Sequence, residues 1–358
     1  MEISGKIMEY PIIQGGMGIG VSMSRLAGNV ARNGGMGVIS SVNAGYNEED
    51  FYSNPDLTNE KALVKQIKMA RKISENHGLI GVNIMVAVNN YENMVKAAIK
   101  ADADAIISGA GLPMELPKLV KGTNTLFAPK ISSGKAAKVL LKYYDKKYNV
   151  IPDFIVIEGF MAGGHLGFSK ENLSDNTCEN NKQILNEVKK EINVYENKYK
   201  RKIPLFVAGG IFDGRDMAEI ISAGADGVVI GTRFIVTEEC DASDVFKDVI
   251  INSKSDDIKI IESPVGMPAR AVSTPLIERL KRGDKFSAKI CNNCLKACPK
   301  GEKVKYCISR ALINAARGNY EEGLFFCGEN ASRISKKTTV EKLMNEIISD
   351  YRRYMKEK

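Results

Sequence analysis

Short apolar runs alternate with longer segments of helical period along most of this chain, and no other feature of the sequence constrains its fold as strongly. The runs are rich in Ile, Val and Phe, which favour strands. Strands that are apolar throughout are typical of parallel sheets covered by helices. The predicted strands are PIIQGGM from Pro11, MGVISSV from Met36, LIGVNIMV from Leu79, AIISGAG from Ala105, TLFAPKIS from Thr125, FIVIEG from Phe154, PLFVAGG from Pro204 and GVVIGTRF from Gly227. Eight such units predict a closed (β/α)8 barrel, and an open doubly wound sheet is the alternative.

The helical pattern is clearest between residues 184 and 199, and the alternation fades after about Asp241. In the first stretch, spacings of four and three place one apolar stripe on the core-facing side of a helix. The stripe consists of Ile184, Val188, Ile192, Tyr195 and Tyr199. Beyond Asp241 come a helix, the loop SPVGMPAR, a helix near TPLIERL, a cysteine-containing segment and a final helix. We therefore predict a barrel over residues 1–240 and a C-terminal helical extension over residues 241–358.

The formal charge of +8 could suit acidic substrates or nucleic acids, but its distribution favours neither. The lysines are scattered along predicted helices rather than gathered in a basic tract with aromatic neighbours. No apolar run approaches the roughly 20 residues of a membrane span, and MEISGKIMEY lacks a signal-peptide core. We expect a cytoplasmic protein with no nucleic-acid or membrane partner.

Glycines end two successive predicted strands, where a phosphate could bind. They are Gly209 and Gly210 in VAGGIFDG, and Gly231, followed by Thr232, in VIGTRF. Backbone N–H groups at strand ends and helix N-termini bind anions, and the loops after strands seven and eight of a barrel commonly hold a phosphate. Tight turns alone would also explain such glycines. The early GGMGIGVS does not fit the dinucleotide motif, because Val21 stands where its third glycine should be.

These motifs, taken in order, resemble the nitronate monooxygenase family, formerly called 2-nitropropane dioxygenases, which also includes the FabK-type enoyl-ACP reductases. The shared motifs are PIIQGGMG, GVNIM, SGAGLP, EGFMAGGHLG, VAGGI and VIGT. The resemblance implies a TIM barrel that binds FMN at its C-terminal face. It agrees with the barrel predicted from the alternation.

The resemblance also implies which residues hold FMN. Those beside the flavin ring would include Asn83, the glycine pair of AGGH, and Glu158, which stands where many relatives have Gln. The phosphate would lie at the two glycine-rich strand ends. The implied FMN-binding residues are Gly16, Met17, Gly18, Asn83, Glu158, Gly163, Gly164, Gly209, Gly210, Gly231 and Thr232.

His165, one of two histidines, matches the active-site histidine of the family. An imidazole of ordinary pKa can accept a proton near neutral pH or, once charged, pair with an anion. The resemblance implies oxidation of an alkyl nitronate to a carbonyl compound and nitrite with O2. His165 would take the α-proton of a neutral nitroalkane or hold the nitronate anion. Met161 replaces an acidic residue found in many relatives, which weakens the inference about substrate.

Five of the seven cysteines crowd the C-terminal segment. CNNCLKAC followed by Cys307 has the spacing C-x2-C-x3-C-x8-C, and Cys327 follows in FFCGEN. Thiolates so spaced can converge on zinc or an iron–sulfur cluster, but free cysteines are often simply buried. We assign no metal ligands from the sequence and leave open whether Cys291, Cys294, Cys298, Cys307 and Cys327 bind one.

Three alternatives to a nitronate monooxygenase remain. A FabK-type reductase would use NAD(P)H and place His165 near an acyl thioester carbonyl. A phosphate-binding barrel without flavin would have Lys130 as its one obvious Schiff-base candidate, and an electron-transfer module would be built around the cysteines. We expect a small-molecule substrate as a partner. Whether the protein also binds NAD(P)H or forms a homodimer is left open. Arg270 in SPVGMPAR would pair with an anion at the barrel mouth or form a solvent-facing salt bridge.

Overall fold

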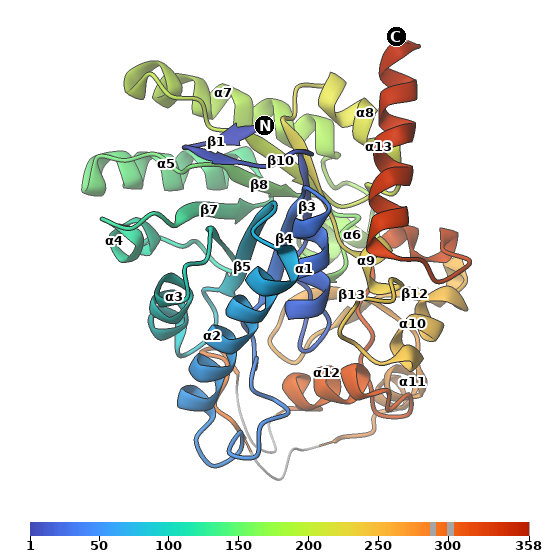
Figure 1. The fold of residues 1–358 in the computed structure, drawn as a ribbon. Coiled ribbons are helices and arrows are strands. Elements are labelled where there is room, and N and C mark those ends of the chain that lie inside the picture. Colours follow the sequence, from blue (N-terminus) through green and yellow to red (C-terminus); the bar gives the residue numbers. More distant parts are fainter. Residues whose placement is uncertain (287–290, 299–303, 358) are drawn as a thin grey trace.

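The computed structural model describes residues 1–286, 291–298 and 304–357, and its centre is a closed barrel of parallel strands (Figure 1). Around the barrel the order is β10, β11, β3, β4, β5, β6, β7 and β8. The barrel strands are β3 (Ile12–Gln14), β4 (Met36–Ser40), β5 (Leu79–Met85), β6 (Ala105–Gly109), β7 (Leu126–Ile131), β8 (Ile155–Glu158), β10 (Leu205–Ala208) and β11 (Gly227–Ile230). Each lies within one of the eight predicted runs, and closure of the sheet excludes the open doubly wound alternative.

Helices surround the barrel, and further helices and strands follow it in the chain. The helices of the barrel region are α1 (Ser24–Arg32), α2 (Pro55–Ser74), α3 (Tyr91–Lys100), α4 (Leu116–Val120), α5 (Gly134–Tyr148), α6 (Lys170–Ser174), α7 (Asn181–Tyr199), α8 (Gly214–Ser222) and α9 (Thr232–Ile235). The later helices are α10 (Asp244–Ile251), η1 (Ser255–Asp257), α11 (Pro275–Lys281), α12 (Ile308–Arg317), η3 (Glu329–Arg333) and α13 (Val340–Lys356). The last run, GVVIGTRF, is a strand only to Ile230, because Thr232 begins α9.

The core has two layers, one inside the barrel and one between the strands and the helices. Side chains from alternate strand positions, such as Val38 and Phe206, fill the interior. A hairpin of β1 (Glu2–Ile3) and β2 (Lys6–Ile7) closes the N-terminal end, where Ile3 joins the interior cluster. This leaves the carboxyl ends of the strands as the end where a site can form.

Helix α7 carries the predicted apolar stripe. Ile184 and Val188 are fully buried against the strands, while Tyr195 and Tyr199 pack partly buried beside them. The helix begins with a capping box, in which Asn180 Oδ1 accepts from Gln183 N at 3.1 Å and Gln183 Oε1 accepts from Asn180 N at 2.8 Å. The prediction for this segment is confirmed.

The C-terminal residues extend the outer ring of helices and add a small sheet. Helix α13 packs against α8 and α1, and so completes the outer ring at the place where α9 is short (Figure 1). Helices α11 and α12 lie near a three-stranded antiparallel sheet of β12 (Ile258–Glu262), β13 (Pro268–Val272) and β9 (Gly164–His165). The division at residue 240 stays a prediction. Among the described residues, no helix combines the length and apolar character needed to span a bilayer.

Candidate active site

A cavity of about 450 Å³ opens at the carboxyl ends of the barrel strands. Its walls combine strand ends and their loops with C-terminal segments around Leu295, Ser309 and Phe326. Small-molecule and cofactor sites have volumes of roughly 300–1,000 Å³, and barrel enzymes react substrates at this face. All the predicted FMN-binding residues and His165 line the cavity.

Glycines shape the backbone at the ends of β10 and β11. Gly209 and Gly210 have φ angles of 89° and 83°, which L side chains rarely adopt. Gly231 has an ordinary φ of −110°, and a methyl group there would meet nothing closer than Met17 Sδ at 3.5 Å. The turn therefore explains the first two glycines, whereas Gly231 leaves space inside the cavity.

The C-terminal segment closes over these strand ends. Gly328 N donates to Thr232 Oγ1 at 2.8 Å, and Asn330 Nδ2 donates to the Gly210 carbonyl at 2.9 Å. Thr232 accepts this hydrogen bond and its hydroxyl can still donate one. Residues 328–330 thus line the end of the cavity where the phosphate is predicted to bind, although no sequence motif indicated them.

Three glycines predicted to lie beside flavin have protein atoms where a side chain would point. A Cβ at Gly16 would overlap Asn83 Cβ, and one at Gly163 would overlap the Cys327 backbone. A Cβ at Gly164 would lie 3.3 Å from the Phe326 ring. Close packing against the protein therefore accounts for the absence of side chains here, and flavin contact at these positions stays a prediction.

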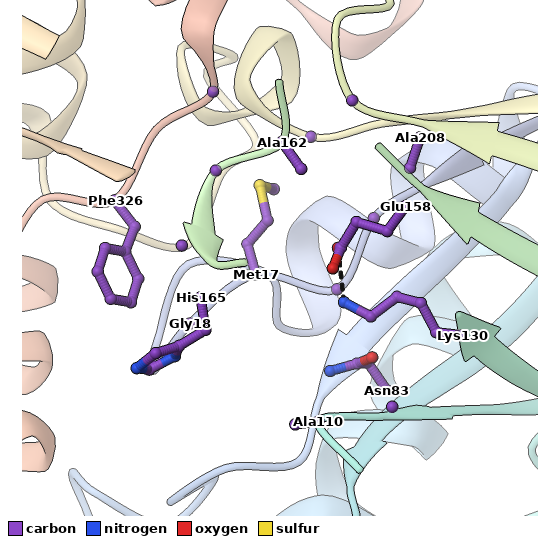
Figure 2. Close-up of a pocket in the computed structure, with 18 of the residues that line it drawn as sticks. Met17, Gly18, Asn83, Ala110, Lys130, Glu158, Ala162, His165, Ala208 and Phe326 are labelled. Atoms are coloured by element: carbon purple, nitrogen blue, oxygen red, sulfur yellow. Dashed lines mark hydrogen bonds and ion pairs between the residues drawn. The ribbon is translucent and has the colours of Figure 1, made fainter. Parts of the chain in front are cut away.

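Asn83 projects from β5 into the cavity, with Met17 and Gly18 lining the same space (Figure 2). No hydrogen bond joins the Asn83 side-chain amide to another described residue. The Met17 N–H is already used, because it donates to Ser22 Oγ at 2.8 Å. The free amide of Asn83 can therefore both donate to and accept from a ligand.

Lys130 on β7 and Glu158 on β8 form an ion pair in the cavity, with 2.7 Å between Lys130 Nζ and Glu158 Oε1 (Figure 2). Neighbouring barrel strands bring the two side chains together. Both are mostly shielded, with side-chain exposures of 27% and 15%. Lys130 was the Schiff-base candidate of the flavin-free alternative, and the structure pairs it with a carboxylate.

His165 lies in β9, which pairs with β13 of the C-terminal region. Its Nε2 is 2.8 Å from Oγ of the buried Ser263. Its ring meets Phe326 edge to face, with centroids 5.4 Å apart. Burial, and then the positive charge of Lys130, lower the pKa of His165 to about 4.

This lowered pKa bears on the expected role of His165, which stays a prediction. A pKa of about 4 favours the uncharged imidazole at neutral pH and so disfavours pairing with an anion by charge. The uncharged imidazole retains one nitrogen that can accept a proton and one N–H that can donate. The sequence could not reveal this, because the burial comes from residues about 100 and 160 positions further along the chain.

Arg270 was expected at the mouth of the barrel or in solvent, and the structure places it in neither position. It belongs to β13 rather than to a loop, and its side chain is 5% exposed. Its Nη1 donates to the carbonyls of Phe160 and Ala162, both at 2.6 Å, and its Nε lies 2.7 Å from Glu329 Oε2. Arg270 therefore ties the loop that carries His165 to the C-terminal segment.

The sequence predicted the strands of the site but not several residues around His165. Ser263 lies in SPVGMPAR, which was singled out for Arg270, and Phe326 lies in FFCGEN, which was singled out for Cys327. Lys130 was recognised as a lysine on a strand, but its pairing with Glu158 depends on the register between β7 and β8. Nothing in the sequence indicated that residues beyond position 290 belong to the cavity wall.

Comparison with known proteins places the whole chain in one family. The model of a family described as nitronate monooxygenase matches residues 2–350. A probable nitronate monooxygenase from Staphylococcus aureus is 25% identical over 300 residues, which cover 77% of this chain and 78% of that protein. A 5-hydroxy-7a-methyl-1-oxo-octahydro-1H-indene-4-carboxyl-CoA dehydrogenase from Rhodococcus jostii is 26% identical over 274 residues. That match covers 76% of this chain but 65% of the relative, slightly under two thirds of its length.

Solved structures share the fold. FabK from Thermotoga maritima has a TM-score of 0.75 and 24% identity, with 98% of this chain and 95% of that chain covered. The nitroalkane oxidase from Streptomyces ansochromogenes has a TM-score of 0.74 and 18% identity, with coverages of 98% and 99%. At these identities the similarity concerns the fold.

Proposed function

The chain belongs to the nitronate monooxygenase family of oxidoreductases, and on that premise we propose that its cavity binds FMN and that it oxidises alkyl nitronates. The observation that carries the proposal is the space beside Gly231, at a glycine-rich strand end of a cavity that reaches Asn83 and His165. The residues present fit the group. The flavin would supply the redox chemistry, while the protein would bind the flavin, orient the substrate and set the electrostatic environment of both.

Each end of the cavity supplies a different part of the proposed site. The backbone at Gly231 and the hydroxyl of Thr232 would hold the phosphate, since the N–H groups of Thr232 and Arg233 begin α9 and have no partner within that helix. The amide of Asn83 would meet the polar edge of the flavin ring. The phosphate would need no dedicated lysine, because backbone N–H groups suffice for such sites.

The side chains near His165 define what the substrate would meet. The ring nitrogen of His165 that does not carry hydrogen would accept the α-proton of a nitroalkane, as a weaker base than an ordinary histidine because its pKa lies at about 4. A nitronate anion would pair by charge with the ammonium group of Lys130 rather than with His165. Arg270 acts indirectly, because it holds the loop from Phe160 to Ala162 in place.

One observation favours a second candidate, a FabK-type reductase. A neutral imidazole is suited to donate a hydrogen bond to an uncharged carbonyl, such as that of an acyl thioester, and it gains nothing from an anionic substrate. In this case NAD(P)H would supply the electrons. The two candidates share the cavity and differ in substrate and electron donor.

The test begins with the absorption spectrum of the purified protein and with Gly231→Ala. The new methyl group makes only ordinary contacts with the protein, so we expect an unchanged unfolding midpoint together with at least about tenfold weaker FMN binding, equivalent to about 1.4 kcal/mol. Gly16→Ala is the contrast, because overlap with Asn83 should reduce stability as well. A wild-type protein that binds no FMN, or a Gly231→Ala variant that binds it normally, contradicts the proposed site.

Anaerobic addition of an alkyl nitronate and, separately, of NADH then distinguishes the candidates. Bleaching of the flavin by nitronate alone supports the monooxygenase. Rapid bleaching by NADH supports the reductase.

A further inference from the structure

Four cysteines lie on two segments, each of which contributes residues to the cavity wall. Cys291, Cys294 and Cys298 belong to one loop, and Cys307 immediately precedes α12. All four are free thiols. Their spacing places three potential ligands within eight residues and a fourth nine residues further on.

Hydrogen bonds fix the first segment to the loop after β5. Asn89 N donates to the Cys294 carbonyl at 3.1 Å, and Lys296 N donates to the Ala87 carbonyl at 2.9 Å. Leu295 also forms a β-bridge with Val88. Cys294 and Leu295 thereby form part of the cavity wall.

The second segment reaches the same wall from α12. Ile308 and Ser309, which follow Cys307, line the cavity together with Cys294. The side chains of Asn43 and Ser309 are hydrogen-bonded, which ties the start of α12 to the loop after β4. The fold thus brings two cysteine-bearing segments to one place beside the cavity.

The two segments also share one apolar cluster. Cys294 and Cys298 pack partly buried against the cluster that contains Tyr306 and Ile308. Cys307 stands between Tyr306 and Ile308 in the sequence. The packing of these neighbours therefore places Cys307 in the same region of the fold as Cys294 and Cys298.

Two buried polar groups without a partner adjoin these cysteines. Tyr306 precedes Cys307 and is 4% exposed, and its hydroxyl makes no hydrogen bond to a described residue. Asn292 follows Cys291, and its Oδ1 is likewise buried and unpaired within the described part of the chain. The Tyr306 hydroxyl can donate to sulfur, and hydrogen bonds to sulfur tune iron–sulfur clusters, whereas the Asn292 oxygen can only accept.

The remaining cysteines are separate from this group. Cys240 Sγ donates to the Val21 carbonyl at 3.4 Å. Cys327 is fully buried in another apolar cluster, where its charged neighbours are Arg270 and Glu329. Cys178 lies in the loop before α7, and Arg270 is its charged neighbour.

We propose that Cys291, Cys294, Cys298 and Cys307 bind an iron–sulfur cluster of the [4Fe–4S] type beside the cavity. Three closely spaced cysteines and one distant cysteine suit such a cluster, whereas a structural zinc site usually has two C-x2-C pairs and this chain has one. As placed in the structure, no three potential ligands among the described residues are close enough to share a metal ion. Binding would therefore draw the loop of Cys291 to Cys298 toward Cys307, as metal binding commonly orders its own site.

The first experiment uses the wild-type chain, purified without oxygen and reconstituted with ferrous iron and sulfide. We expect about four iron and four acid-labile sulfide per chain and an absorption that dithionite bleaches. Alkylation followed by mass spectrometry should show four protected thiols that become reactive after chelation of the iron. Protection of Cys291 is the most telling, since it is exposed without a ligand. Zinc as the bound metal, or no metal at all, overturns the proposal.

Variants then test the assignment of ligands. Cys291→Ala and Cys298→Ala should each lose most of the iron, while the matched control Cys178→Ala retains it. FMN, released by denaturation and measured separately, should be unchanged in all three, so that failure of the cluster and failure of the flavin site remain distinguishable. A cluster that survives in both ligand variants contradicts the assignment. If the variants do not fold, the wild-type alkylation pattern decides.

Discussion

Protonation of His165 should destabilise the protein, and the expected loss in the free energy of unfolding follows from the pKa of this residue. The folded pKa is about 4, against 6.5 for an unperturbed histidine. The unfolded chain therefore takes up the proton first as the pH falls, so the contribution to stability is present above pH 6.5 and is lost toward the folded pKa. Between about pH 7 and pH 4.5 the loss is about 2 kcal/mol.

The assay compares the free energy of unfolding in urea for wild type and His165→Gln across this pH range. Other groups also titrate, but they do so in both proteins, so the difference isolates His165. Wild type should lose about 2 kcal/mol more than the variant. His77→Gln is the matched control, because it removes the exposed second histidine and should follow wild type.

Nuclear magnetic resonance gives a direct measurement of the same pKa. The chain has two histidines, so the ring signal absent from His165→Gln identifies the buried one. It should titrate near pH 4. A signal that titrates near 6.5, together with parallel stability curves for wild type and His165→Gln, would refute the inference that burial keeps this imidazole neutral.

Three further predictions concern the supports of the site. Arg270→Met should lower the free energy of unfolding by about 3 kcal/mol in urea, because two carbonyls and the partly exposed Glu329 lose their partner; a loss within 0.5 kcal/mol, the size typical of surface changes, would contradict the proposed tie. Lys130→Met should raise the pKa of His165 in the same resonance experiment, because it removes the nearby positive charge, and Lys142→Met on the outer helix α5 should not. Asn180→Ala should lower the free energy of unfolding by about 1 kcal/mol, because α7 loses its N-terminal cap, and should leave the FMN content unchanged. A matching loss of FMN would show that the start of α7 contributes to the site.

Local pattern was sufficient to predict the barrel. Leu205–Ala208 is recognisable because every position is apolar, and Leu79–Met85 because every position except Asn83 is. Helix α7 is recognisable because its stripe repeats at helical spacing. These signals depend on neighbours a few residues apart. The chain order of strands then determines which of them adjoin in a barrel.

The candidate site was only partly predictable for a physical reason. The glycines at positions 209, 210 and 231 could be identified because they directly follow strands, and strand ends converge at one face. Asn83, which lies within β5, and His165, which lies in β9 beyond the end of β8, were identified by the resemblance to the family motifs. The roles of Gly163 and Arg270 depend on the C-terminal segment that crosses them. No spacing in the sequence records which distant segment will cover a loop.

The sequence by itself determined the alternation of strands and helices, the position of His165 in the segment that follows β8, and the spacing of the four cysteines. The tertiary structure decided that burial lowers the pKa of His165, that Lys130 pairs with Glu158, and that the segment of Cys307 reaches the same cavity wall as Cys294. Secondary structure follows from side-chain period and local conformational preference, which act over a few residues. Protonation and pairing follow from burial and charge in three dimensions, which depend on residues far apart in the chain.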